Sequence, residues 1–223
     1  MVGARVGDFY TDSQGRVRPI TKKTGALVAG AALVGTVALG TGGGAVGGAA
    51  VSEGLSAAAE ARVTAARNTA ARGQRGQTWK RLRVKQARNK FRPQRHLNCV
   101  RNSHGEVRTF FVLTPCRSLD RVLTVLIDLE GNTFVLSVYW VRMRNAAAAR
   151  EFQELDDTFG TGNVNPVAGG LLGLVGVRFT GRYYDSRMRG PLVVVAEAEP
   201  VTGAPSGETL ESVVRAVTYL PPP

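Results

Sequence analysis

An uncharged segment of 29 residues, TGALVAGAALVGTVALGTGGGAVGGAAVS, follows Lys23 and constrains the chain more than any other feature. A helix that spans a membrane needs roughly 20 mainly apolar residues, and this segment meets that length. Its second half has small residues at a spacing of four, which lets two membrane helices pack closely: Gly40, Gly44 and Gly48. We predict a transmembrane helix at 24–52 that self-associates through these glycines. The alternatives are a cleaved signal peptide and a soluble Ala/Gly-rich helix.

The basic residues on either side of this segment predict its orientation. Four Lys or Arg lie in the fifteen positions before Thr24, whereas the fifteen positions after Val51 contain only Arg62. Because loops beside a span are more basic on the cytoplasmic side, we expect a cytoplasmic basic tail at 1–23 and a C-terminal part outside the cytoplasmic membrane. Basic residues farther along reverse this orientation if they are counted, but the rule weakens with distance from the span.

Most of the positive charge lies directly after the uncharged segment. Residues 53–95 carry twelve Lys or Arg and two Glu, or +10 of the net charge of +12, whereas residues 96–223 carry −1. Strong helix formers at 53–72 predict a helix, so we expect a basic helical stalk at 53–95. Its second half contains Lys80, Arg81, Arg83, Lys85, Arg88, Lys90, Arg92 and Arg95. This segment is interpreted either as a binding site for nucleic acid, anionic lipid or an anionic wall polymer, or as a plain basic linker.

The pattern changes after residue 95 to that of a globular domain at 96–223. Runs of β-branched and aromatic residues predict strands, and apolar residues at helical spacing predict helices that Asn145 and Ser206 cap. The strands are expected at 106–113, 122–128, 133–143, 177–184 and 191–199. Neighbouring strands and two one-sided helices predict an α+β fold, with an antiparallel sheet of about five strands and both helices on one face.

The stretch HLNCVRNSHGEVRTFFVLTPC holds both cysteines and both histidines of the chain. Four nitrogen and sulfur ligands, His96, Cys99, His104 and Cys116, match the number in a tetrahedral zinc site. Their irregular spacing does not match the usual paired ligands, and two cysteines 17 residues apart outside a membrane are expected to oxidise. A Cys99–Cys116 disulfide is therefore predicted, and free thiols remain the alternative for a cytoplasmic domain.

No catalytic constellation, phosphate loop or dinucleotide fingerprint is visible in the sequence, so we expect neither an enzyme nor a cofactor. The acidic cluster Glu151, Glu154, Asp156 and Asp157 is interpreted as a solvated helix face. Arginine and tyrosine gather near one expected hairpin, and these side chains often anchor recognition. The residues are Arg182, Tyr183, Tyr184, Arg187 and Arg189. This group is either a recognition patch or an ordinary hairpin tip.

The motifs LTPCRSLDR, YWVRM, GTGNV, VRFTGRYY and VVVAEAEP resemble those of uncharacterised actinobacterial proteins with one N-terminal span ahead of a small α+β domain. The resemblance covers most of the chain after the expected stalk and implies no function for any residue. The order of strands and helices is also similar to that of sensor and lipoprotein domains that bacteria display outside the membrane.

These features together predict a single-pass membrane protein whose extracytoplasmic domain binds or senses a partner without catalysis. The alternative places the domain in the cytoplasm, where residues 62–95 bind nucleic acid or anionic lipid at the membrane. An enzyme whose site the sequence does not reveal is a third class.

Overall fold

The computed structural model describes residues 9–11, 17–19, 55–96, 98–158, 160–167 and 177–223. The expected transmembrane helix at 24–52 lies outside these residues, as do Gly40, Gly44 and Gly48. In the described ranges, no helix has the length and the apolar character that crossing a membrane requires. Two short strands, β1 (Phe9–Thr11) and β2 (Val17–Pro19), form a separate antiparallel pair.

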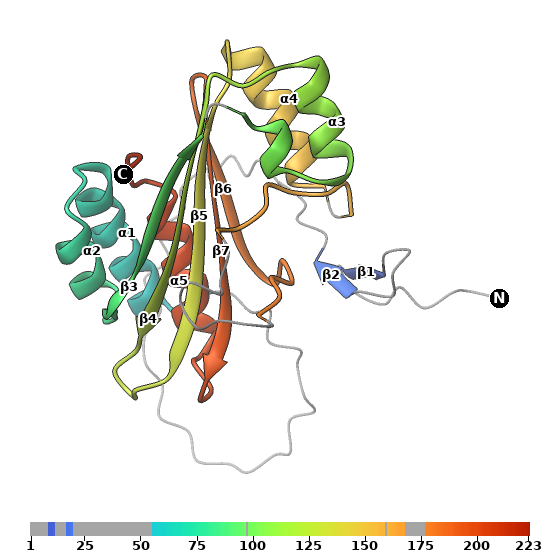
Figure 1. Ribbon diagram of the computed structural model, residues 1–223. Coiled ribbons are helices and arrows are strands. Elements are labelled where there is room, and N and C mark those ends of the chain that lie inside the picture. The colour runs from blue at the N-terminus through green and yellow to red at the C-terminus, as the bar shows by residue number, and fades with distance from the viewer. Residues whose placement is uncertain (1–8, 12–16, 20–54, 97, 159, 168–176) are drawn as a thin grey trace, which may run out of the picture. The chain divides into compact units, whose positions relative to one another are not determined.

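A five-stranded antiparallel sheet forms the centre of the domain (Figure 1). Its order is β3-β4-β5-β7-β6, so β3 and β6 are the edge strands. The middle strands β4, β5 and β7 are buried along most of their length, which explains why they read as almost continuous apolar runs. The bounds are β3 (Lys85–His96), β4 (Ser118–Ile127), β5 (Thr133–Arg142), β6 (Tyr183–Arg189) and β7 (Leu192–Thr202). The predicted α+β class and antiparallel sheet are confirmed.

Three helices cover one face of the sheet: α1 (Ala57–Ala71), α2 (Arg75–Arg81) and α5 (Gly207–Val217). Ser56 caps α1 and Ser206 caps α5 through their side-chain oxygens, as the sequence predicts for Ser206. On the sheet, Val138, Trp140 and Val194 face these helices and are almost fully buried. Because successive side chains of a strand point to opposite faces, the residues next to these three in sequence face the other side of the sheet.

The helix expected at 53–72 is confirmed as α1, but the expected stalk at 53–95 is wrong, because residues 55–95 build part of this domain. On α1, four residues at helical spacing are completely buried: Ala59, Val63, Ala66 and Ala70. Their small side chains let α1 lie against α5, and Trp79 of α2 enters the same core. The last part of the expected stalk is the edge strand β3, which pairs with β4. Lys80, Arg81 and Arg83 are exposed, whereas their neighbours Trp79, Leu82 and Val84 are buried.

The opposite face carries α3 (Gly105–Leu113) and α4 (Ala146–Asp156), preceded by a 3-10 turn, η1 (Val100–Asn102). Phe111 of α3 and Phe152 of α4 are fully buried, with ring centroids 5.0 Å apart. The prediction that both helices share one face is therefore wrong. The helix capped by Asn145, α4, contacts Tyr139 and Val195, whereas α5 contacts their strand neighbours on the other side.

Two expected strands also differ from the structure. Residues 106–113 form α3 instead of a strand, because Val107 and Phe111, four apart, are the fully buried pair. The β-branched and aromatic content of this stretch imitates a strand, but its buried residues have helical spacing. The strand expected at 177–184 begins only at Tyr183, because the backbone amides of Thr180 and Gly181 bind the side chains of Glu199 and Glu197 instead of a neighbouring strand.

Candidate functional site

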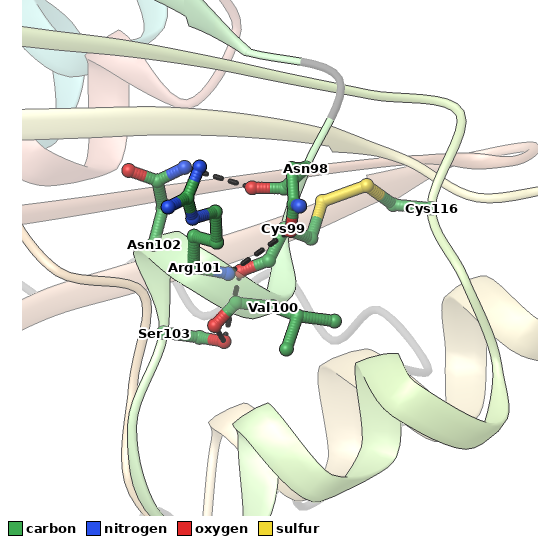
Figure 2. The surroundings of a disulfide bond; sticks show 7 residues. All are labelled: Asn98, Cys99, Val100, Arg101, Asn102, Ser103 and Cys116. Carbon is green, nitrogen blue, oxygen red and sulfur yellow. Dashed lines mark hydrogen bonds between the residues drawn. A yellow bond between two sulfur atoms is a disulfide. The ribbon is translucent and has the colours of Figure 1, made fainter.

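The two cysteines form the predicted disulfide, with their Cα atoms 6.2 Å apart (Figure 2). Cys99 directly precedes η1 and is buried, and the Ser103 hydroxyl donates a hydrogen bond of 2.9 Å to the Cys99 carbonyl oxygen. The bond joins the turn after β3 to the segment that follows α3. It therefore fixes both ends of the excursion that contains α3.

The alternative zinc site at His96, Cys99, His104 and Cys116 is overturned, because the two sulfurs bond to each other and are not available as thiolates. His104 is exposed and its Nδ1 lies 2.8 Å from Asn165 Oδ1. The His96 side chain lies outside what the structure describes. In the described ranges, no group of three His, Cys, Asp or Glu side chains is arranged to hold a metal ion.

The last residue of α4, Asp156, has a carboxyl group with two tyrosine partners. Asp156 is buried, and its Oδ2 accepts hydrogen bonds from the hydroxyls of Tyr139, at 2.5 Å, and Tyr184, at 3.0 Å. The Tyr184 hydroxyl also lies 2.9 Å from Asp157 Oδ1, and the Tyr139 hydroxyl lies 2.6 Å from Asn163 Oδ1. Asp156 Oδ1 is buried without a hydrogen-bond partner among the described residues.

The protonation of this cluster follows from its burial. Burial raises the pKa of Asp156 to about 7, although the hydrogen bonds from Tyr139 and Tyr184 oppose the shift. Burial and the nearby Asp156 carboxylate raise the pKa of both tyrosines well above their usual value, so both stay protonated donors. The expected solvated acidic face is therefore wrong for Asp156, although Glu151 and Glu154 are exposed. The cluster can bind and release a proton near neutral pH.

The expected recognition patch is divided between the two faces of the sheet. Tyr184 points to the α4 side and bonds Asp156, whereas Tyr183 packs with the core under α5. The Arg182 guanidinium lies over the Tyr183 ring at 5.3 Å, and that of Arg187 lies over the Tyr219 ring at 3.9 Å. Arg189 is exposed at the end of β6. The structure thus does not gather these five residues into one surface.

The basic segment is divided as well. Arg62 forms a 2.8 Å ion pair with Glu208, Arg67 donates to the Arg215 carbonyl, and Arg75 lies over the Phe91 ring. These arginines help attach α1 and α2 to the rest of the domain. Lys80, Arg81, Arg83 and Lys85 are exposed, whereas the side chains of Arg88, Lys90 and Arg92 lie outside what the structure describes.

Strand register brings five exposed arginines to one end of the sheet, and we call this surface the arginine end. Arg142 closes β5 and lies across β7 from Arg189, because both pair with Leu192. The Arg117 amide donates a 2.7 Å hydrogen bond to the Arg142 carbonyl. The five residues are Arg95, Arg117, Arg142, Arg144 and Arg189. The sequence analysis missed this surface, since only the pairing of the strands aligns residues so far apart in the chain.

Comparisons with known proteins identify no relative: no family model, no curated protein and no solved structure matches this chain.

Proposed function

We propose that the α+β domain is a non-catalytic binding domain held outside the cytoplasmic membrane by a single-pass anchor at 24–52, with residues 1–23 in the cytoplasm. The disulfide between Cys99 and Cys116 carries the proposal, because disulfides persist in oxidising compartments and are rare in the cytosol. The basic residues before the uncharged segment favour the same orientation.

The arginine end supports binding of an anionic partner. Arginine presents a planar group of donors that matches phosphate and carboxylate oxygens, and it stays charged at any physiological pH. The only acid on the same rungs of the sheet among the described residues is Asp120, which is 4% exposed and lies 3.3 Å from Arg95. The described strand residues at this end of the sheet therefore carry a net positive charge and include no exposed acid.

Topology labelling tests the location. Leu129 is 69% exposed in the turn between β4 and β5, so a cysteine placed there by Leu129→Cys is open to reagents. We expect a membrane-impermeant maleimide to label this variant in intact cells. A Ser13→Cys variant is the matched control and should react only after lysis. Labelling of the Ser13→Cys variant alone in intact cells would refute the proposal.

The redox state of Cys99 and Cys116 in cells tests the location of the domain independently. Cells lysed in acid and alkylated in denaturant with a maleimide polymer should show an unshifted wild-type chain unless reductant is added first. Cys99→Ser leaves Cys116 as a single thiol, so this variant should shift once without reductant and thereby validates the assay. Two shifts of the wild-type chain without reductant would contradict an extracytoplasmic domain.

The structure also favours one second candidate, in which residues 62–95 bind nucleic acid or anionic lipid from a cytoplasmic domain. Lys80, Arg81, Arg83 and Lys85 are exposed in succession, and the chain has no Asp or Glu between Glu60 and Glu106. Retention of duplex DNA by the full chain at increasing salt tests it, because each phosphate contact contributes about one unit to the salt slope. Changing these four residues to Gln should reduce that slope by about three to four units.

A further inference from the structure

We infer that the arginine end docks on an anionic phospholipid surface, with Val112 and Leu113 inserted among the lipids. The inference rests on the proposed binding function and names its partner. It combines two neighbouring features, the five arginines and the exposed apolar tip of α3.

The arginines lie close to one end of the sheet, although Arg95, which pairs with Asp120, lies two rungs farther in than Arg142, so one surface can meet them together. Arg142 and Arg189 lie on the last rung of the sheet, Arg95 lies near the end of β3, and Arg117 and Arg144 flank the strands. Five strands at a spacing of about 4.8 Å make this end about 19 Å wide. Arg95 remains 74% exposed despite its contact with Asp120. Such a group matches the phosphates of several adjacent lipid headgroups.

The end of α3 adds apolar side chains to the same end of the domain. Val112 is 60% exposed and Leu113 is 79% exposed, whereas Val107 and Phe111 of the same helix are fully buried and Phe110 is partly buried. Only four positions separate Leu113 from Arg117, and Figure 1 shows α3 beside the end of the sheet where β4 begins. Arg108, one helical turn before Val112, is also exposed.

This tip is held rigidly. Phe110 and Phe111 pack against Phe152 of α4, with ring centroids at 6.2 Å and 5.0 Å. The disulfide at Cys116, three residues after Leu113, anchors the segment that leaves the helix (Figure 2). The exposed apolar pair is therefore presented at a fixed place, and docking does not need to order it first.

The apolar pair decides between a bilayer and a soluble polyanion. A polyanionic chain such as nucleic acid or polyphosphate attracts the arginines but gives Val112 and Leu113 no apolar environment. A bilayer supplies both, because interfacial binding combines apolar burial with attraction to anionic headgroups. Among the described residues, a third exposed large apolar side chain, Leu129, lies at the opposite end of the strands and serves as a matched control.

Vesicle binding by the full-length chain tests the inference. The chain is held in zwitterionic nanodiscs and then sedimented with vesicles of phosphatidylcholine, either alone or with about one third phosphatidylglycerol. We expect at least about tenfold stronger retention on the anionic vesicles, since each basic residue near such a surface contributes about fivefold. Changing Arg117, Arg142, Arg144 and Arg189 to Gln should remove this preference. The same change at Lys80, Arg81, Arg83 and Lys85 should alter retention by less than about twofold.

The apolar contribution has its own variant and control. The double variant Val112→Ser, Leu113→Ser should lose about tenfold on anionic vesicles and keep its retention on immobilised polyphosphate. Leu129→Ser should behave as wild type. The inference would be overturned if the double variant bound vesicles as the wild type does, or if the chain bound polyphosphate or DNA more strongly than vesicles. It would also be overturned if the Gln variant of Lys80, Arg81, Arg83 and Lys85 lost as much vesicle binding as the variant of the arginine end. Topology labelling in intact cells uses no vesicles, so it still tests the proposed location of the domain if the lipid inference fails.

Discussion

The two faces of the sheet are built from the same strands but stabilised differently. The face under α1, α2 and α5 is filled with apolar side chains such as Trp140, and its ion pairs lie at the rim. The face under α3 and α4 contains the Asp156 cluster, the buried acid Glu197 and the disulfide. The backbones at Gly105 and Gly162 also approach there too closely to admit a Cβ atom.

The difference indicates which conditions each face responds to. Apolar burial depends little on pH or redox state, so the apolar core under α5 should tolerate both, although burial also raises the pKa of Asp185, which accepts a hydrogen bond from Thr218 at the end of α5. The α4 face depends on a carboxyl that titrates near neutrality and on a covalent bond that reductant breaks. The four predictions below test this comparison, from the largest expected effect to the smallest.

Trp140→Ala should destabilise the domain most. Trp140 is 1% exposed, and its indole Nε1 donates a 2.7 Å hydrogen bond to the Leu220 carbonyl, so the variant creates a cavity and removes a donor. The free energy of unfolding should fall by about 3 to 5 kcal/mol, equally at pH 5 and pH 7. Denaturant unfolding measures it, with exposed Leu129→Ala as the control. A loss below about 1 kcal/mol would contradict the importance of this face.

Removal of the disulfide by Cys99→Ser with Cys116→Ser should cost about 3 kcal/mol, because a loop of this length no longer restricts the unfolded chain. Reductant should lower the melting temperature of the wild type and leave the double variant unchanged. Equal sensitivity of the two chains to reductant would show that the bond does not stabilise this face.

Stability should fall as pH rises from 5 to 7 because of Asp156. Its folded pKa of about 7 lies above the usual carboxyl value of 3.8, so the folded state binds more protons between these values. The contribution is complete at low pH and is lost as pH rises through about 7, which amounts to roughly 2 kcal/mol between pH 5 and 7. Asp156→Asn should flatten the profile by this amount. Asp185, whose pKa burial also raises, stays in both chains and cancels in the difference.

Arg215→Gln should have the smallest effect, below about 1 kcal/mol. Arg215 lies 2.6 Å from Glu60 of α1 and 3.0 Å from Glu211, but its side chain is 35% exposed and solvent screens both pairs. Denaturant unfolding should show no difference from wild type in about 1 M salt. A larger loss would mean that ion pairs, and not the buried alanines, hold α1 on the domain.

The sequence predicts the parts of the fold whose signal is local. The apolar runs of β4, β5 and β7, the Asn145 and Ser206 caps and the cysteine pair all agree with the structure. The membrane anchor at 24–52 and the location of the domain remain predictions.

Features that depend on distant partners were not predictable in this way. The helix at 53–72 was predicted, but the charge of residues 53–95 favours a solvated stalk, because alanine gives only a weak hydrophobic signal for the side of α1 that is buried. Asp156 looks like a surface acid until β5 and β6 bring Tyr139 and Tyr184 to it, from 17 and 28 residues away. The arginine end requires the register of five strands, which the sequence does not specify.

The excursion from β3 to β4 makes the α3 region an insertion between two neighbouring strands. His96 pairs with Leu119, so the chain leaves and re-enters the sheet at neighbouring positions. A tight hairpin turn is enough to join strands at that separation. Everything from η1 to the second cysteine is therefore an insertion into a β-hairpin, closed on itself by its own covalent bond. A shorter connection would leave the order of the strands unchanged but would uncover Phe152 of α4, so the insertion acts as a lid on the core of this face.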